Sequence, residues 1–320
     1  MEKAPLIGAF LLLFLAKHRM IQHMKNEEIN FVYFGGEPLG VPVLEELQSA
    51  GLTPSLIVCS PDKPVGRKQV MTAPPVKVWA EANSVEVWQP EGYKSDEAQA
   101  AAETKLRSLQ AEVFVVVAYN YILPQWLLDI PTKGVVNVHP SMLPLLRGAS
   151  PIRTAIKDNL RDAIGVTIMQ MDAKMDTGPI LEQMPMPTSD ELWPVLGPDL
   201  DIALARMGGA MLADVLPDYV AGAISPQEQQ HDQATYCGRL SKVDSEVKLD
   251  PFHLPIGQPA KELMNYVAAF TGIGDTWFTH EGKRVKIKEA ELSQGKFCPM
   301  IVIPEGKSAI DFTVWLQNAA

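Results

Sequence analysis

The sequence predicts an α/β fold, with an open, mostly parallel sheet followed by a smaller, shortened, β-rich and barrel-like domain. Apolar runs of strand length alternate with helical stretches as far as residue 222, and uninterrupted apolar strands are typical of parallel sheets covered on both faces. Beyond residue 227 the pattern changes to short strands separated by Gly turns. A chain of 320 residues is long enough for about two such domains.

The alternation begins with the apolar strand INFVYFGG at 29–36. In the helix that follows, Val43, Leu44 and Leu47 lie on one face, and Gly51 ends the helix. The same pattern predicts further strands at 56–60, 85–90, 113–119, 134–140, 165–171 and 179–186, further helices at 76–84, 102–111, 123–131, 150–158 and 199–221, a polar loop at 61–75 and a turn at 172–178.

The second domain is predicted to contain a helix and at least three strands, at 259–270, 275–282, 283–291 and 298–304. The chain therefore divides into an N-terminal extension, a main domain, a polar linker and a second domain, at 1–25, 29–222, 223–232 and 233–320.

The N-terminal extension holds an apolar run at 6–16, which is shorter than the roughly 20 residues of a membrane-spanning helix. Three interpretations stay open: translation starts at Met20 or Met24, the run is a secretory signal or anchor, or it is a helix docked on the protein. We expect no stable membrane partner.

The charge and the cysteines limit the class of protein. A formal charge of −10 argues against nucleic-acid binding over a long surface, because such binding is driven by Lys and Arg. Cys59, Cys237 and Cys298 match neither a disulfide framework nor a zinc ligand spacing. We expect a reducing, cytoplasmic setting.

Asn137 and His139 lie at the end of the apolar strand at 134–140. Ligands of open parallel sheets bind beyond the carboxyl ends of the strands, and residues two apart on a strand project to the same side. An amide and an imidazole placed in this way can stabilise an oxyanion and transfer a proton. The alternative is that Asn137 caps a turn and that His139 makes a hydrogen bond in the core.

The turn at 172–178 contains Asp172 and Asp176 between two strands. Two aspartates in a turn that ends in Gly are most often Asx-turn residues. If the turn lies beside His139, however, one carboxylate could orient the imidazole.

Two other loops bear on the choice of ligand. The first turn, FGGEP at 34–38, lacks the G-x-G-x-x-G order and places an acidic residue where a pyrophosphate would bind, which disfavours a dinucleotide. The loop at 61–75 carries Lys63, Arg67 and Lys68 in an otherwise acidic chain. Such a cluster is usually a solvated loop, but beside an active site it can meet phosphates.

Three segments resemble the methionyl-tRNA formyltransferase family of the formyltetrahydrofolate-dependent formyltransferase superfamily. The segments are NVHPSMLPLLRGASPI at 137–152, GVTIMQMDAKMDTGPIL at 165–181 and SPDKPVGRKQVMTAPPVKVWA at 60–80. The first two are shared across the superfamily, and the third points to the tRNA branch. The resemblance extends from about residue 29 almost to the end, and it implies a Rossmann-like formyltransferase domain at 29–222 and a tRNA-binding type of domain at 233–320.

The resemblance implies that Asn137, His139 and Asp176 are the catalytic residues of transfer from 10-formyltetrahydrofolate to the acceptor end of initiator methionyl-tRNA. It implies a folate site formed by Tyr119, Tyr121, Leu123, Ser141, Met142, Leu143, Pro144 and Asp172. It implies tRNA contacts through Lys63, Arg67 and Lys68. No metal is required, and we expect a monomer.

The sequence departs from the family at two places. The usual G-T-P-x-F of the first turn is GGEPL at 35–39, which could loosen a turn beside the acceptor amine. The second domain is short, and residues 231–320 carry ten Lys and Arg against eleven Asp and Glu, so it lacks the expected basic surface.

Three other functions stay open. One is a formyltransferase that acts on an amino sugar or another small amine through the same residues. The second is a nucleotide-binding oxidoreductase, which the missing glycine pattern disfavours. The third is a non-catalytic folate-binding or RNA-binding relative.

Overall fold

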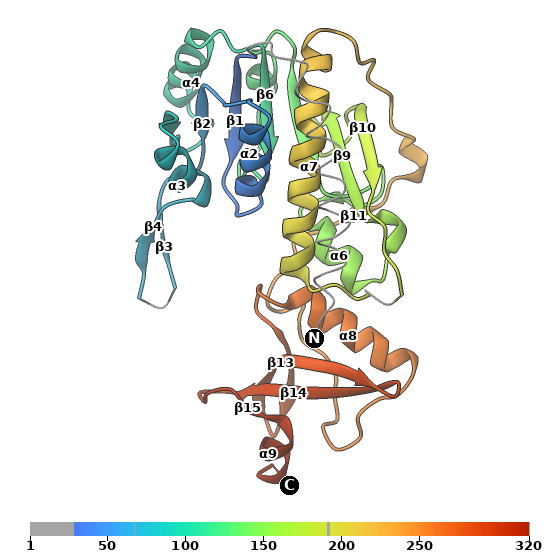
Figure 1. Ribbon diagram of the computed structural model, residues 1–320. Helices are drawn as coiled ribbons and strands as arrows, with labels where there is room; N and C mark the ends of the chain where they lie inside the picture. The colour runs from blue at the N-terminus through green and yellow to red at the C-terminus, as the bar shows by residue number, and fades with distance from the viewer. Residues whose placement is uncertain (1–28, 67, 191–192, 320) are drawn as a thin grey trace.

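The computed structural model describes residues 29–66, 68–190 and 193–319, which form a sheet-based domain and a smaller second domain (Figure 1). The expectations for residues 1–25 and for the contact of Arg67 therefore lie outside the described residues. All three cysteines are free.

The main domain is built on a seven-stranded sheet in the order β10-β9-β7-β6-β1-β2-β5. The pairs from β7 to β5 are parallel, whereas β9 runs antiparallel to both of its neighbours, β7 and β10. The prediction of a mostly parallel sheet is confirmed. The strands are β1 (Phe31–Gly35), β2 (Leu56–Val58), β5 (Val87–Trp88), β6 (Val113–Val117), β7 (Val135–His139), β9 (Gly165–Gln170) and β10 (Ile180–Pro185).

Helices cover both faces of this sheet, as the apolar strands require. Along β1, Phe31 and Tyr33 belong to the core beneath α2 and α7, while Val32 and Phe34 belong to the core beneath α4 and α5. This alternation follows from the two-residue period of a strand. The helices are α2 (Gly40–Ser49), α3 (Pro75–Ala82), α4 (Asp96–Ser108), α5 (Gln125–Leu128), α6 (Pro151–Lys157) and α7 (Gly197–Val220), and a 3-10 turn covers Arg161–Ala163.

The segment predicted as a polar loop at 61–75 instead contains a hairpin of β3 (Lys63–Val65) and β4 (Val70–Thr72). Every described side chain of these two strands is exposed. The alternation of buried and exposed residues that identifies a strand is therefore missing, which explains why the sequence pattern indicated a loop. Figure 1 shows the hairpin extending from the end of the sheet that faces the second domain.

The second domain is an antiparallel sheet in the order β12-β13-β14-β15, packed against α8, with α9 following the last strand. Phe278, Phe297 and Val302 are fully buried in its core. The β-rich second domain is thus confirmed. Its elements are α8 (Gln258–Phe270), β12 (Thr276–His280), β13 (Lys283–Ser293), β14 (Lys296–Pro304), β15 (Ile310–Asp311) and α9 (Phe312–Gln317).

Arg153 of α6 joins the two domains. Its Nη1 donates to the carbonyl oxygens of Ala269, at 2.7 Å, and Thr271, at 2.9 Å, at the end of α8, and its Nη2 pairs with Asp201 of α7. A Cβ on Gly197 would lie 1.7 Å from Nη1, so only glycine leaves room for this guanidinium. A buried charge needs such partners, and here they fix α8 against the main domain.

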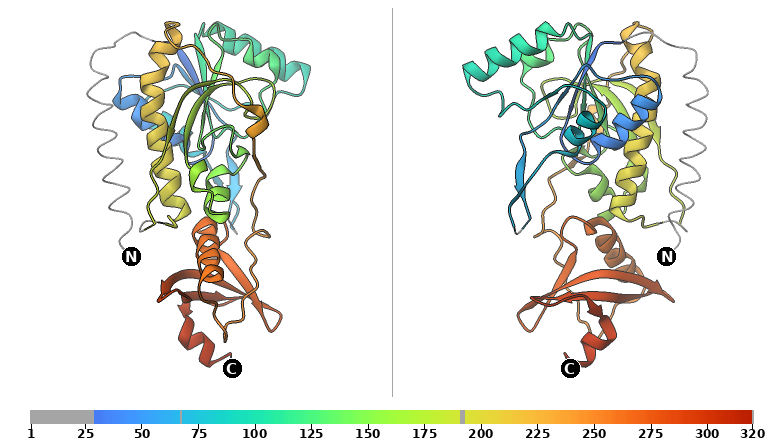
Figure 2. Two further views of the ribbon diagram at one scale, coloured as in Figure 1. Left: turned by 90° about the vertical axis from the view of Figure 1, so that its right-hand side faces the viewer. Right: turned by 60° about the vertical axis from the view of Figure 1, so that its left-hand side comes forward.

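The segment between the domains follows the main domain closely. Because α7 runs away from the second domain, the chain returns along the side of the sheet to reach it (Figure 2). On the way, Gln227 forms a bridge to Ile180, a 3-10 turn covers His231–Gln233, and β11 (Tyr236–Cys237) pairs in parallel with β8 (Arg147–Gly148). The polar composition of residues 223–232 did not predict these contacts.

No helix among the described residues is long and apolar enough to cross a membrane.

Candidate active site

The candidate site lies where the strand order changes direction. The chain passes from β1 to β2 on one side and returns to β6 on the other side, and the crevice at such a switch point is where open α/β sheets bind ligands. The turn after β1 closes on the loop after β6 through a hydrogen bond from the Glu37 amide to the Ala118 carbonyl, at 3.4 Å. A Cβ on Gly36 would lie 3.9 Å from the Ala118 carbonyl oxygen and 3.3 Å from the side-chain nitrogen of Asn120. These backbones therefore approach closely at the edge.

Asn137 and His139 end β7 beside this crevice. Val135 packs in the core beneath α4 and α5, while Val136 and Val138 pack in the opposite core. By the two-residue period of the strand, Asn137 and His139 lie on the same face as Val135. Asn137 is half-buried and His139 is only 4% exposed. The packing of the neighbouring valines agrees with the predicted placement of Asn137 and His139 on one face.

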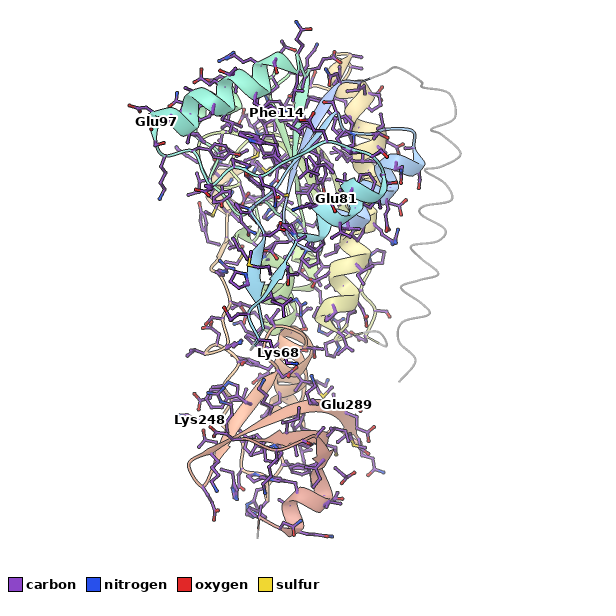
Figure 3. All side chains as sticks on the ribbon, turned by 90° about the vertical axis from the view of Figure 1, so that its left-hand side faces the viewer. Lys68, Glu81, Glu97, Phe114, Lys248 and Glu289 are labelled. Atoms are coloured by element: carbon purple, nitrogen blue, oxygen red, sulfur yellow. The ribbon has the colours of Figure 1, made fainter. Side chains whose placement is uncertain are left out.

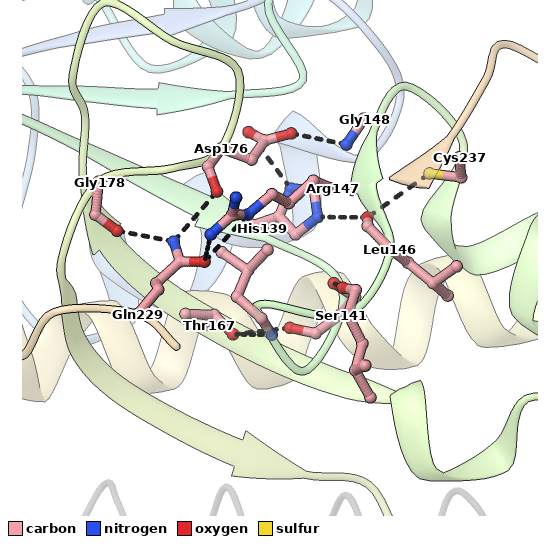
Figure 4. A network of polar contacts seen from close by, with 12 residues as sticks. His139, Ser141, Leu146, Arg147, Gly148, Thr167, Asp176, Gly178, Gln229 and Cys237 are labelled. Carbon is pink, nitrogen blue, oxygen red and sulfur yellow. Dashed lines mark hydrogen bonds and ion pairs between the residues drawn. The ribbon is translucent and has the colours of Figure 1, made fainter. Parts of the chain in front are cut away.

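The imidazole of His139 lies between a carbonyl group and a carboxylate (Figure 4). Its Nε2 is 3.1 Å from the carbonyl oxygen of Leu146, which can only accept, so Nε2 carries the hydrogen. Its Nδ1 lies 3.7 Å from Oδ1 of Asp176. That distance is too long for a hydrogen bond, so Asp176 is a close neighbour of the ring and not a bonded partner.

Asp176 also binds the segment after β7 through its carboxylate. Its Oδ2 accepts a hydrogen bond of 2.8 Å from the backbone amide of Gly148. Its own backbone has φ of 55°, a conformation that a non-glycine residue adopts at some cost. The turn at 172–178 thus lies beside His139, as the hypothesis of an orienting carboxylate required.

Asp172, in the same turn, is engaged locally. Its carboxylate accepts from the Lys174 amide at 3.0 Å and from the Thr177 hydroxyl at 2.7 Å. This is the Asx-turn role that the sequence allowed for either aspartate. The two aspartates differ, because only Asp176 approaches the imidazole.

Tyr119 and Tyr121 belong to an aromatic cluster beyond β6. The hydroxyl groups of Tyr119 and Tyr93 are 2.7 Å apart, and the rings of Tyr119 and Tyr121 meet edge to face with centroids 5.6 Å apart. Burial raises the pKa of Tyr93 and of Tyr119 well above the ordinary value. Leu123 is buried against this cluster, whereas the intervening Ile122 is 86% exposed.

The loop at 141–144 is held by buried polar contacts. Thr167 of β9 donates to the Ser141 carbonyl oxygen at 2.7 Å and accepts from the Leu143 amide at 3.1 Å. Gln183 of β10 donates to the Leu143 carbonyl oxygen at 2.7 Å. Ser141 and Leu143 are buried, while Met142 and Pro144 are half-buried. The side chains of Met142 and Pro144 are therefore the more accessible part of this loop.

The basic loop is separate from this buried group. Lys63 and Lys68 are exposed on the β3–β4 hairpin, and Figure 3 shows Lys68 at the end of the main domain nearest the second domain. Within the described part of the chain, neither lysine contacts the His139 imidazole. Their role in binding tRNA remains a prediction.

Sequence reasoning missed two buried residues beside the site: Gln229, which donates to the Asp176 carbonyl oxygen, and Arg147, which binds Gln229. Arg147 is 2% exposed, and Gln229 of the inter-domain segment is 5% exposed. A charged residue within the apolar, proline-rich stretch LPLLRGASP was a signal for Arg147. Gln229 stands in a polar run and had no such signal.

Among the described residues, no group of three or more His, Cys, Asp or Glu side chains could hold a metal ion.

With this geometry in view, the comparison with known proteins decides the family. A protein-family model described as formyl transferase matches residues 28–191. The chain belongs to this family. The resemblance stated from the sequence is thereby confirmed.

Curated relatives agree over most of the chain. The methionyl-tRNA formyltransferase of Stutzerimonas stutzeri is 34% identical over 89% of this chain and 86% of its own length. That of Synechococcus sp. (strain JA-2-3B'a(2-13)) is 39% identical over 86% of this chain and 81% of its own. That of Herpetosiphon aurantiacus is 43% identical over 68% of both.

Solved structures share the fold at lower identity. A methionyl-tRNA formyltransferase from Clostridium thermocellum aligns with a TM-score of 0.54 and 14% identity, over 88% of this chain and 99% of that one. An N-formyltransferase from Helicobacter canadensis aligns with a TM-score of 0.56 and 18% identity, over 83% and 88%. The predicted formyltransferase fold is confirmed.

Proposed function

We propose that the protein transfers the formyl group of 10-formyltetrahydrofolate to the α-amino group of initiator methionyl-tRNA. The observation that carries this proposal is the grouping of Asn137, His139 and Asp176 at the switch point of a formyl transferase sheet. Curated relatives at 33–43% identity named methionyl-tRNA formyltransferase support the choice of acceptor.

The reaction places three requirements on the site. The amine attacks the formyl carbon, and the carbonyl oxygen gains negative charge as the new C–N bond forms. The bond from the formyl carbon to N10 of the folate then breaks, while the attacking nitrogen loses a proton and N10 gains one. The site must stabilise the oxyanion, move that proton and exclude bulk water.

The described residues suit these tasks. The Asn137 amide makes no side-chain hydrogen bond to any described residue, so its NH₂ group can donate to the oxyanion. His139 carries a hydrogen on Nε2, which leaves Nδ1 as an acceptor beside the Asp176 carboxylate. The imidazole can therefore accept the proton and return it.

The folate contacts are proposed for the surface beside this edge. The half-buried rings of Tyr119 and Tyr121 and the exposed Ile122 offer apolar area to a planar pterin. Met142 and Pro144 would frame the ligand on the other side. The N-formyltransferase of Helicobacter canadensis was solved with folinic acid, which supports a folate-derived donor.

An assay of the purified protein tests the proposal. The protein is incubated with 10-formyltetrahydrofolate and, in separate reactions, methionyl-tRNA and dTDP-linked amino sugars, and products are identified by mass spectrometry. Formyl-methionyl-tRNA is the expected product. Formylation of the amino sugar alone would contradict the proposal, and the amino-sugar arm is included because the Helicobacter canadensis structure holds dTDP-3-aminofucose.

A further inference from the structure

Arg147 is a buried cation next in the chain to Gly148, whose amide binds the carboxylate of Asp176. It is 2% exposed, and its hydrogen bonds go to His231, Tyr236 and Gln229, the last of which Figure 4 shows. The Oε1 of Gln229 accepts from Nε at 3.1 Å and from Nη2 at 2.7 Å. A buried guanidinium without acceptors is costly, so this amide oxygen is the central partner of Arg147.

The guanidinium determines which way the Gln229 amide points. A guanidinium only donates, so the oxygen of Gln229 must face it and the NH₂ group must face away. That NH₂ group donates to the carbonyl oxygen of Asp176 at 3.0 Å and to that of Gly178 at 2.7 Å. One side chain of the inter-domain segment therefore spans the turn that carries the catalytic aspartate.

The turn depends on such support because its backbone is constrained. Asp176 has a positive φ, and a Cβ on Gly178 would lie 2.0 Å from the carbonyl oxygen of Gln170. Gly148 meanwhile holds the carboxylate of Asp176 and is itself pressed against Cys237, whose carbonyl oxygen would lie 2.1 Å from an added Cβ. The backbone and the side chain of Asp176 are thus held by separate contacts.

Leu146, the hydrogen-bond partner of His139, is held by the same inter-domain segment that contains Gln229. Leu146, whose carbonyl oxygen accepts from the imidazole, also has a positive φ of 57°. Its amide donates to Oγ1 of Thr235 at 2.8 Å, and its carbonyl oxygen accepts from Sγ of Cys237 at 3.5 Å. Residues 229–237 therefore contact both neighbours of the imidazole: the Leu146 carbonyl group and the turn that carries Asp176.

We propose that Gln229 is a positioning residue for formyl transfer: held by Arg147, it fixes the Asp176 turn and thereby the distance from that carboxylate to His139. The inference rests on the proposed function for its kinetic consequence, but its geometric part concerns the imidazole alone. Gln229 touches no reacting atom and acts through Asp176. It also places the segment that leads to the second domain in direct contact with the catalytic centre.

Gln229→Glu is the sharpest variant. It keeps an oxygen for Arg147 and the shape of the side chain, but it replaces the two N–H donors with an acceptor that faces two carbonyl groups. The matched control is Gln230→Glu, which makes the same change on the exposed neighbouring residue. We expect kcat to fall about tenfold to a hundredfold in Gln229→Glu, as for small misplacements of catalytic groups. We expect KM for either substrate to change less than about twofold.

The ¹⁵N chemical shifts of the His139 ring nitrogens give a readout that needs no substrate. They report the tautomer and the surroundings of the imidazole, and they should move in Gln229→Glu but match the wild type in Gln230→Glu. Identical shifts in the two variants would overturn the proposal. A wild-type protein that forms no formylated product would contradict the proposed function and leave this comparison valid.

A measurement on the wild type covers the case in which Gln229→Glu does not fold. The side-chain NH₂ protons of Gln229 should exchange with solvent at least about tenfold more slowly than those of exposed Gln230, because they are bonded and buried. Exchange at the rate of Gln230 would show that the turn is not held in this way and would overturn the proposal.

Discussion

The buried edge after β7 and the exposed β3–β4 hairpin are both expected to meet substrate, but they are held differently. His139 and Arg147 are almost fully buried, and their surroundings are fixed by bonds such as that from Cys237 to Leu146, 91 residues apart. The hairpin strands are exposed, and the Gln69 and Thr72 side chains bond within three residues. A rigid edge suits chemistry, whereas a loosely held hairpin can adapt to a large substrate.

His139→Ala should cause the largest loss of activity among the variants that test this comparison. Losing the group that moves the proton should lower single-turnover formylation by about a hundredfold to ten-thousandfold at saturating donor. The control is His253→Ala, whose side chain is 84% exposed in the second domain, and it should match the wild type. Wild-type turnover in His139→Ala would show that the buried edge is not the catalytic region.

Arg153→Ala should cause the largest loss of stability among the variants considered. It leaves Asp201 and the end of α8 without their buried partner, and breaking such a pair costs about 3–5 kcal/mol. Denaturant unfolding monitored by Trp fluorescence measures it. Arg107→Ala removes an exposed pair on α4 and should cost at most about 1 kcal/mol. Equal losses in the two variants would argue against Arg153 as the link between the domains.

The double variant Arg67→Ala, Lys68→Ala should act on tRNA alone. We expect KM for methionyl-tRNA to rise about threefold to tenfold and the slope of log KM against log salt to fall by about one or two, because phosphate contacts are lost. KM for the folate donor should stay unchanged. Lys94→Ala, an exposed charge before α4, serves as the control. Similar changes in KM for both substrates would remove the hairpin from tRNA recognition.

The smallest effect, a change in melting temperature at low pH, is expected at Asp62, which directly precedes β3 of the hairpin. Hydrogen bonds from Gln89 and Lys77 lower the pKa of Asp62 below its ordinary value. The contacts of ionised Asp62 therefore stabilise the fold above its ordinary pKa of about 3.9 and are lost as the pH falls toward the lower folded value. The melting temperature of the wild type should drop more steeply below about pH 4 than that of Asp62→Asn. Parallel curves would mean that Asp62 does not anchor the hairpin.

The sequence was most informative where function depends on short spacing. Asn137 and His139 stand two apart at the end of an apolar strand, and Asp176 stands in a turn between strands, so the sequence alone marks them as candidates. The hairpin was missed because its exposed strands lack a buried face. Gln229 was missed because it carries no local pattern, and its value comes from Arg147, which lies 82 residues away.

Spacing along the chain thus accounts for the order of strands and helices, for the face that Asn137 and His139 share, and for the family. It does so because strand and helix periods are local and repeat every two or 3.6 residues. The 3.7 Å between His139 and Asp176 is a different kind of property. Gly148 and Gln229 bind Asp176 and Leu146 binds His139, and Gln229 reaches the turn because α7 carries the chain away from the second domain and the following segment passes the site on its return.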